Sequence, residues 1–537
     1  MRSATIFLAT TAAYAFQLPF NLPFFSSASQ TPLVAPPQEV HDAAVPNRIA
    51  IIGAGAAGSS AAFWISKAKE RYGVDVEVDV YDKNAWVGGR DTTVQPYDDE
   101  SAMPHELGAS IFVKINKNIW RAVDEFGLER VNFEDEDDVM GLWNGQEFVL
   151  STGGGGFLNG WMDKIKILWR YGYHAPTKTQ ELVGAMADKF ARLYKPNTPH
   201  WTNISSVSDT LEFSPLVAQT TAEYLDLQGV NKLWSRELVE AATRVNYGQD
   251  VDKIHALEGM CSLAAYSASS VKGGNWQVFD HFLKHSKANL FRETTVKSVL
   301  RTSSGWLVHS TLSDVPRAYR TVVLAAPYHQ TGISFSAEPS LAHVPWQPYV
   351  HLHVTLLSTS SPAPNPAYFN LRPGSKTPST ILTTYDGVRH GGPEPEFNSV
   401  SYHGPLMMKN GERRVNAQGE QEWTVKVFSK KRVDDKWLKE MFEGKVGWVY
   451  RHEFDAYPVL PPTTTFPPVK LAEGLYYVNA FEPLISTMET ETIAARNVVE
   501  LLMKEQFDAG LCKAEDVEKS MADGKLDDDD YVYGWDC

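Results

Sequence analysis

Apolar and polar residues follow two different periods along the chain. Short apolar runs at 48–52 and 76–81 have the composition of buried strands, and 59–72 between them has helical spacing. Strands that alternate with helices in this way predict a parallel sheet covered by helices, the α/β arrangement. Further on, apolar residues recur at helical spacing over 180–194, whereas 349–356 alternates strictly and predicts a strand of a mixed sheet.

The first fifteen residues have the features of a signal peptide. Arg2 provides a positive start, residues 4–13 are mostly small or apolar, and a small-x-small pattern predicts cleavage after Ala15. A buried helix or an N-terminal anchor are the alternatives, but this apolar run is shorter than the roughly 20 residues that span a bilayer. We expect a secretory-pathway protein without a stable transmembrane segment, lysosomal, vacuolar or secreted. Residues 16–47 are expected to be a disordered leader, and Asn203 begins a glycosylation sequon.

Composition excludes several classes of function. The 537 residues carry 50 basic and 65 acidic side chains, a net charge of −15, and show no basic block that would bind nucleic acid. The three cysteines are too few and too scattered for a disulfide framework, a thiolate zinc site or an iron–sulfur cluster, and no metal site is predicted. The acidic segment 506–537 is expected to be a solvated tail with an exposed aromatic tip.

The strongest chemical signal is a glycine-rich turn, GAGAAG, between the first strand and its helix. Gly53 permits a tight turn, Gly55 allows a pyrophosphate to approach closely, and Gly58 lets helix and strand pack. The helix N-terminus, which includes Ala57, offers free N–H groups to phosphates. Asp82 ends the second strand, where its carboxylate can accept hydrogen bonds from ribose hydroxyls and would repel a 2′-phosphate. FAD or NAD is therefore expected rather than NADP; a turn without a ligand is the alternative.

A second glycine motif favours FAD over NAD. Gly88, Gly89 and Arg90 form a Gly-Gly-Arg run that resembles the phosphate-side motif of the glutathione-reductase and amine-oxidase class of flavoproteins. The two glycines let backbone N–H groups reach the cofactor, and the guanidinium can meet its phosphates.

The same resemblance implies further cofactor contacts. A small-residue segment would lie under the flavin and a turn would lie over the adenine; their residues are Gly108, Ala109, Ser110 and Val296. Ser486, as N-cap, and Met488 open a helix whose N-terminus would point at the flavin pyrimidine ring and stabilise the anionic reduced flavin. A helix capped for stability alone is the alternative.

The middle of the chain resembles one family within this class. The RVNYGQ run at 244–249, the Gly-Gly-Asn at 273–275 and the segment 451–461 are similar to prenylcysteine oxidase, also called prenylcysteine lyase. The resemblance extends from about residue 49 to about residue 502. Asp82 stands where that family usually has glutamate, a chemically mild departure.

The resemblance implies an FAD-dependent thioether oxidase that acts on the farnesyl- or geranylgeranyl-cysteine left by degraded prenylated proteins. Hydride would leave the isoprenoid carbon next to sulfur for the flavin, water would add, and the adduct would collapse to an isoprenal and free cysteine. Dioxygen would reoxidise the flavin and be released as hydrogen peroxide. The protein would supply orientation, an apolar tunnel and a group that activates water.

Several residues are candidates for these tasks. Those for the amino-acid end of the substrate are Arg244, Asn246, Tyr247 and Gln249. Arg244 would meet the substrate carboxylate, and an internal salt bridge is the equally supported alternative. His105 and His255 are candidates for handling the water proton, although a solvent relay would need neither. The apolar stretch 161–169 could line the tunnel or simply pack in a core.

The motifs predict an α/β fold, α+β overall, with a discontinuous FAD-binding Rossmann domain of the glutathione-reductase and amine-oxidase type. Its segments are 48–150, 255–335 and 465–505. The insertions, helical at 151–254 and sheet-forming at 336–464, would build a mixed substrate-binding domain. Two other functions are compatible with the motifs: an amine oxidase of the same fold, and a catalytically silent protein that binds flavin or prenyl groups. No oligomeric state is predicted.

Overall fold

The computed structural model describes residues 47–132, 139–153, 157–196, 198, 200–265, 268–336, 341–524 and 529–537, with the side chains of 157–161 left out. The predicted signal peptide, 1–15, and all but the last residue of the predicted leader, 16–47, lie outside these residues. Within the described ranges, none of the helices combines the length and the apolar character needed to cross a membrane.

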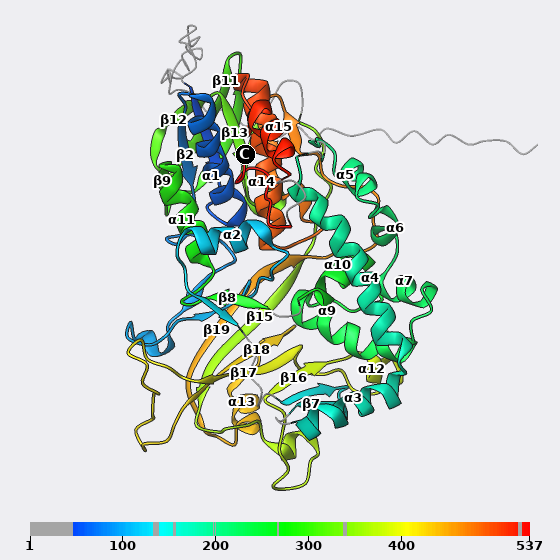
Figure 1. The fold of residues 1–537 in the computed structure, drawn as a ribbon. Helices are drawn as coiled ribbons and strands as arrows, with labels where there is room; N and C mark the ends of the chain where they lie inside the picture. The colour runs from blue at the N-terminus through cyan, green and yellow to red at the C-terminus, as the bar shows by residue number, and fades with distance from the viewer. Residues whose placement is uncertain are drawn as a thin grey trace, which may run out of the picture. The chain divides into compact units, whose positions relative to one another are not determined.

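A six-stranded sheet carries the first glycine motif (Figure 1). Strand β1 (Arg48–Ile52) lies between β2 (Glu77–Tyr81) and β13 (Thr321–Leu324) and runs parallel to both. The order is β20-β21-β13-β1-β2-β9, with β9 at Asn289–Phe291, β20 at Lys470–Ala472 and β21 at Leu475–Tyr477. These strands come from three separate parts of the sequence, so the predicted discontinuous Rossmann-type domain is confirmed.

Helices cover this sheet because its central strands are apolar and buried. Helix α1 (Ala56–Tyr72) packs against α14 (Met488–Phe507) and α11 (Trp276–Ser286), as Figure 1 shows. A four-stranded sheet follows in the order β12-β11-β10-β14; its strands are β10 (Val296–Thr302), β11 (Gly305–Ser310), β12 (Ser313–Tyr319) and β14 (Ser334–Ser336). Burial on both faces explains why β1 reads as a continuous apolar run.

The substrate domain is built on a seven-stranded mixed sheet in the order β19-β15-β18-β17-β16-β6-β7. Its strands are β6 (Val139–Trp143), β7 (Phe148–Gly153), β15 (Tyr349–Thr359), β16 (Thr380–Thr383), β17 (Ser399–Pro405), β18 (Trp423–Ser429) and β19 (Val446–Pro458). Strand β6 pairs with β16 across more than 200 residues of sequence. Residues 139–150 therefore belong to this sheet and not to the first FAD segment, because their pairing partner lies in the second insertion.

Helices dominate the first insertion, as expected. They are α3 (Phe157–Tyr171), α4 (His174–Ala191), α5 (Ile204–Thr210), α6 (Ser214–Val217), α7 (Thr221–Leu227), α8 (Lys232–Trp234) and α9 (Glu240–Tyr247), and α10 (Ala256–Leu263) follows. The remaining helices are α2 (Lys117–Glu125), α12 (Asp386–Arg389), α13 (Asp435–Met441) and α15 (Ala514–Ala522). Two short pairs complete the strands: β3 (Thr93–Val94) with β4 (His105–Glu106), and β5 (Arg130–Asn132) with β8 (Ser269–Val271).

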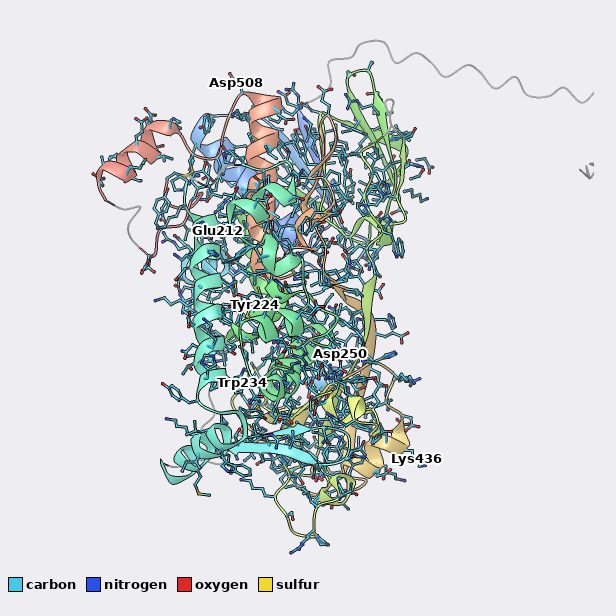
Figure 2. All side chains as sticks on the ribbon, turned by 90° about the vertical axis from the view of Figure 1, so that its right-hand side faces the viewer. Glu212, Tyr224, Trp234, Asp250, Lys436 and Asp508 are labelled. Carbon is cyan, nitrogen blue, oxygen red and sulfur yellow. A yellow bond between two sulfur atoms is a disulfide. The ribbon has the colours of Figure 1, made fainter. Side chains whose placement is uncertain are left out.

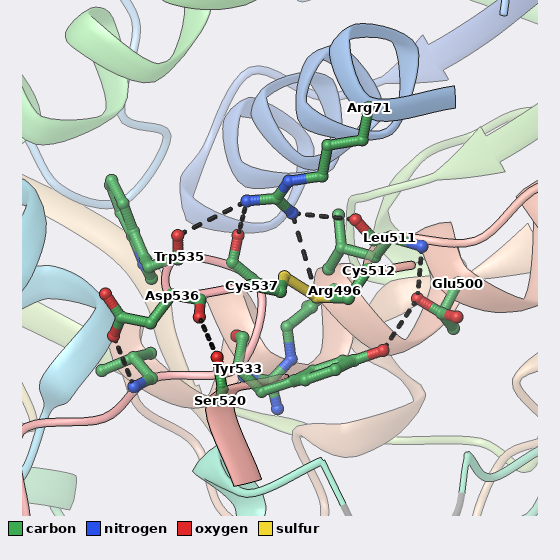
Figure 3. The surroundings of a disulfide bond; sticks show 12 residues. Arg71, Arg496, Glu500, Leu511, Cys512, Ser520, Tyr533, Trp535, Asp536 and Cys537 are labelled. Carbon is green, nitrogen blue, oxygen red and sulfur yellow. Dashed lines mark hydrogen bonds between the residues drawn. A yellow bond between two sulfur atoms is a disulfide. The ribbon is translucent and has the colours of Figure 1, made fainter. Parts of the chain in front are cut away.

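The C-terminal segment differs from the expected solvated tail. A disulfide joins Cys512 to Cys537 (Figure 3). Tyr531 and Tyr533 are buried. The Trp535 ring lies 4.9 Å from the Phe63 ring, centroid to centroid, so the aromatic tip packs on α1. We call residues 529–537 the strap. Its aromatic side chains make apolar contacts that the acidic charge pattern of the segment did not indicate.

Candidate active site

The glycine-rich turn connects β1 to α1 at the carboxyl end of β1. Gly53 has φ +111° and donates its N–H to the Tyr81 carbonyl at 2.7 Å. A Cβ on Gly58 would lie 1.8 Å from the Gly53 carbonyl oxygen, so helix and turn can pack this closely only without a side chain there. Gly55 is the N-cap of α1 and supplies no side-chain cap, and Ala57 is buried in the first turn. This helix end therefore presents backbone N–H groups where an anion can bind.

The second glycine motif lies directly against the first. Gly88 donates its N–H to the Ala54 carbonyl at 2.9 Å, and Gly55 and Gly88 form a parallel bridge. A Cβ on Gly89 would lie 3.2 Å from the Gly55 Cα. The two turns thus form one backbone surface without side chains, of the kind a pyrophosphate requires.

Asp82 is held by the same turn. Its carboxylate accepts hydrogen bonds from the Ala54 N–H at 2.7 Å and from the Asn84 N–H at 2.8 Å. Burial raises the pKa of Asp82 above its ordinary value, although these two bonds oppose the shift. Each carboxylate oxygen keeps a further lone pair, so the predicted ribose contact stays a prediction that this geometry permits.

Arg90 contacts protein groups. Its guanidinium pairs with the Glu482 carboxylate, donates to the Ala456 carbonyl at 3.0 Å, and lies over the Tyr349 ring. These contacts join the second glycine turn to β19 and to the loop before α14. The predicted phosphate contact of Arg90 stays a prediction.

A buried lysine from another strand contacts the segment expected under the flavin. Lys426 of β18 places Nζ 3.0 Å from both the Ser110 Oγ and the Glu106 carbonyl oxygen. Burial lowers the pKa of Lys426 to about 8 and raises the pKa of Glu106 to about 7. Ala109 has φ +53°, and its carbonyl accepts a hydrogen bond from the Asn275 side chain at 2.8 Å. A single lysine within a strand has no distinctive sequence pattern, so the sequence analysis did not identify Lys426.

The predicted cap of α14 is wrong by one residue. Thr487 is the N-cap and forms a capping box with Thr490, so the helix begins at Met488. The N–H of Ser486 instead points to a second missed group, the Glu258 carboxylate, at 3.2 Å and 3.3 Å from its two oxygens. Burial raises the pKa of Glu258 to about 8.

Several polar atoms near these elements are buried without a protein partner, which tests whether a cofactor fits. The Asn479 Oδ1, just before α14, and both carboxylate oxygens of Glu491, in its first turn, have none. Val296, expected beside the adenine, is buried at the start of β10. Because buried polar atoms are normally paired, these atoms and the side-chain-free turns fit a polar ligand such as a dinucleotide.

Arg244 does not fit the role of a substrate partner. Its side chain is 1% exposed, its Nη1 donates to the Asp250 carboxylate at 2.6 Å, and its Nε donates to Thr383 at 3.0 Å. Asn398 lies 3.3 Å from the other Nη. The internal salt bridge, the alternative reading, is the observed one, and Figure 2 shows Asp250 where the helical insertion meets the sheet.

The other residues of the RVNYGQ run are also engaged internally. Asn246 donates to the Ser262 carbonyl at 3.2 Å, and Gln249 bonds both the Pro458 carbonyl and the Leu460 N–H. Tyr247 is buried, with its ring 5.6 Å from the Tyr457 ring, centroid to centroid. These contacts join α9 to the end of β19, so the run positions the two halves of the substrate domain.

Both predicted histidines are buried, and burial makes both of them weaker bases than a free imidazole. His255 is the N-cap of α10: its Nδ1 accepts the Glu258 N–H and its Nε2 lies 3.3 Å from the Pro483 carbonyl, so both nitrogens are occupied. His105 Nε2 lies 3.1 Å from the Thr424 hydroxyl. Burial lowers the pKa of each ring to about 4, with Lys426 adding to the effect at His105. Two neutral, weakly basic rings are the result.

The apolar stretch proposed for the tunnel lies partly at the surface. On α3, the Trp169 side chain is 87% exposed, and Ile165 and Leu168 are exposed as well. These three side chains are neither core nor the lining of an enclosed channel.

The geometry described above agrees with comparisons to known proteins. Residues 159–516 match the prenylcysteine lyase family model, and residues 51–126 match the NAD(P)-binding Rossmann-like domain. The chain belongs to the prenylcysteine lyase family. It is 28% identical to farnesylcysteine lyase of Arabidopsis thaliana over 473 residues, 85% of this chain and 88% of that protein. Prenylcysteine oxidase 1 of Homo sapiens is 28% identical over 476 residues, 84% and 88% of the two chains.

A solved structure shows the same fold. Cyclohexylamine oxidase from Brevibacterium oxydans superposes with a TM-score of 0.54 at 14% identity, covering 86% of this chain and 99% of that one. The family and the fold together support FAD as the cofactor of this member of the prenylcysteine lyase family.

Proposed function

We propose that this protein is an FAD-dependent oxidase that cleaves the thioether of farnesyl- or geranylgeranyl-cysteine to an isoprenal, free cysteine and hydrogen peroxide. The observation that carries the proposal is the family match over 159–516, which spans both insertions of the substrate domain and the third FAD segment. The double glycine surface supplies the matching cofactor site. Bound FAD would supply the two-electron oxidation of the carbon next to sulfur, and dioxygen would then reoxidise the flavin.

The protein's part begins with holding the cofactor. The backbone of the two glycine turns and the N-terminus of α1 would bind the pyrophosphate, and Asp82 would accept hydrogen bonds from the ribose. The N-terminus of α14, capped by Thr487, carries the partial positive charge that favours an electron-rich ring beside it. Glu258 and Glu491 add no negative charge at this end when protonated, and burial raises the pKa of both.

Lys426 is the group that we assign to the proton of the attacking water. Its Nζ contacts Ser110 in the segment expected under the flavin, and its pKa of about 8 allows it to exchange a proton near neutral pH. Its neutral form would accept the proton from water, and its charged form would return it during collapse of the adduct. Lys426 thus replaces His105 and His255 in this role.

Anaerobic addition of farnesylcysteine to the purified FAD-loaded protein tests the proposal. We expect bleaching of the flavin band near 450 nm and, after air is admitted, one isoprenal and one hydrogen peroxide per thioether lost. Cyclohexylamine and S-hexylcysteine are the matched comparisons, because one is an amine and the other lacks the allylic double bond. Bleaching by the amine alone would assign an amine oxidase, and a lack of bleaching by all three would assign a silent binding protein.

We also propose the secretory route, ending in a lysosome, a vacuole or outside the cell. The Cys512–Cys537 disulfide supports an oxidising compartment, and Asn203 is exposed at the start of α5 as an acceptor asparagine must be. Expression in a eukaryotic host followed by peptide-N-glycosidase treatment checks this. A mass decrease that Asn203→Gln abolishes is expected, and a protein retained without glycan in the cytosol would contradict the route.

A further inference from the structure

Two strands at the edge of the seven-stranded sheet bring histidines and carboxylates together on one face. His351 and His353 lie two residues apart on β15, and their side chains therefore share a face. In the antiparallel register, His353 pairs with Glu453 of β19 and His351 pairs with Asp455. A register shift between Val350 and His351 lies at this point, and such bulges re-aim the side chains beside them.

The distances match those of a metal-binding group. The Glu453 Oε2 lies 3.4 Å from the His353 Nδ1 and 3.9 Å from the His351 Nε2. One ligand atom from each of the three residues lies within 4.8 Å of the others. A tetrahedral zinc ion with ligands at roughly 2.0–2.1 Å separates neighbouring ligand atoms by about 3.3 Å, so side-chain adjustments alone close the site.

Asp455 completes the arrangement behind the first histidine. Its Oδ1 lies 3.1 Å from the His351 Nδ1, the nitrogen that faces away from Glu453. A hydrogen bond from Nδ1–H to this carboxylate leaves the lone pair on Nε2, which is how metal-bound histidines are commonly oriented.

We propose that His351, His353 and Glu453 bind a divalent zinc ion, with Asp455 orienting His351 and water in the fourth position. Two imidazoles and one carboxylate are ligands that zinc prefers over calcium or magnesium. Glu453 and His351 are more than half exposed, so an ion can reach the site from solvent. The proposal stands independently of the proposed oxidase activity.

The zinc site would lie on one face of β15 and β19, and residues on the opposite face of the same strands approach the segment expected under the flavin. Leu352, between the two histidines, points to the opposite face and packs in a cluster with Leu107. Phe454, between the two carboxylates, approaches Gly108 so closely that a Cβ there would lie 3.2 Å from its ring. Zinc would therefore hold the edge strand β19 against β15. On the other face of these strands, Leu352 and Phe454 contact Leu107 and Gly108.

Calorimetric titration of the chelator-treated full-length holoprotein with zinc chloride tests the proposal. We expect one equivalent to bind with a Kd of about 10 µM or lower, and at least a tenfold weaker Kd in His353→Gln and in Glu453→Gln. Asp455→Ala is expected to weaken binding by about 10- to 100-fold through the orientation of His351. The matched control is His390→Gln, because His390 is an exposed histidine 3.5 Å from Asp386 that belongs to no group of three possible ligands among the described residues.

Thermal unfolding provides a second readout that does not depend on catalysis. Zinc at ten times its Kd is expected to raise the Tm of the wild type and of His390→Gln, and to leave the Tm of His353→Gln unchanged. Variants that melt like the wild type without zinc show that the fold is intact. Absence of zinc binding at 100 µM, or equal binding by His353→Gln and the wild type, would overturn the proposal.

Discussion

The Nζ of Lys426 lies 3.0 Å from the Oγ of Ser110, although the two residues are more than 300 positions apart in the sequence. Strand β18 supplies the lysine, and the small-residue segment after β4 supplies the serine. This hydrogen bond connects the seven-stranded sheet of the substrate domain to the FAD domain. It also places a titratable group beside the segment that the Gly-Ala-Ser motif assigned to the flavin.

Replacement of Lys426 by methionine keeps the apolar stem and removes the proton carrier. We expect kcat to fall by about 100-fold or more, the size of a general acid–base contribution, and the pH dependence near 8 to flatten. Steady-state formation of the isoprenal from farnesylcysteine between pH 6 and pH 9 measures both effects, because water adds only after the flavin has been reduced. Lys430→Met is the control, because Lys430 pairs with Glu394 at the surface. Unchanged kcat in Lys426→Met would remove this lysine from the mechanism.

Gly58→Ala is expected to prevent FAD binding, because the added Cβ would lie 1.8 Å from the Gly53 carbonyl oxygen. The turn and α1 would have to separate, and the surface for the pyrophosphate would be lost with them. The flavin-to-protein absorbance ratio after purification measures the loss. Gly184→Ala, in the exposed part of α4 with nothing within 4 Å of the new Cβ, should keep its FAD and be as stable or slightly more stable. A fully loaded Gly58→Ala protein would contradict the assigned packing.

Arg244→Met separates a structural role from a substrate-binding role. Breaking the buried pair with Asp250 should lower the free energy of unfolding by about 3–5 kcal/mol, and the KM of the protein that remains folded should change less than about twofold. Urea unfolding and steady-state kinetics at 15 °C provide the two numbers. Arg244→Lys should recover part of the stability. A large rise in KM without loss of stability would restore the substrate-carboxylate role.

Glu258 is expected to make the stability of the fold depend on pH. Burial raises its folded-state pKa to about 8, above the ordinary value of 4.5, so between these values the folded protein keeps a proton that the unfolded chain releases. The resulting stabilisation is complete below pH 4.5 and is lost as the pH rises from 4.5 through about 8. Glu258→Gln keeps an acceptor for the Ser486 N–H and should be less sensitive than the wild type by a few kcal/mol over this window. Urea unfolding at pH 6 and pH 9 measures the difference, and parallel curves for the two proteins would contradict the shift.

Local chemistry explains what could be predicted from the sequence. The strand, the glycine turn and α1 follow from contiguous residues, because Gly53 and Gly58 meet within one turn. The predicted cap of α14 was wrong by one residue because Ser486 and Thr487 are both good caps, and only the structure shows that Thr487 pairs with Thr490 while the Ser486 N–H contacts Glu258. Pairs such as Lys426 with Ser110, or His353 with Glu453, depend on strand register across about 100 residues or more, which no local pattern encodes.

The strap at 529–537 yields the last prediction, because it packs on the two helices whose N-termini face the expected cofactor. Arg71 of α1 donates to the carbonyls of Leu511 and Gly534 at 2.8 Å each, and Arg496 of α14 donates to the Tyr533 carbonyl at 2.9 Å (Figure 3). The disulfide closes a loop with a sequence separation of 25 residues, which contributes about 3.5 kcal/mol by restricting the unfolded chain.

The free energy of unfolding of the double variant Cys512→Ser, Cys537→Ser should therefore be lower by that amount, and the variant should release FAD at a lower urea concentration. Flavin fluorescence during urea titration reports both events. Dithiothreitol provides the matched control: it should lower the wild type to the level of the double variant and leave the variant unchanged, since the third cysteine, Cys261, is a free thiol. If the double variant proves as stable as the oxidised wild type, the strap is held by Trp535 and the arginine contacts alone, and the covalent bond adds nothing to cofactor retention.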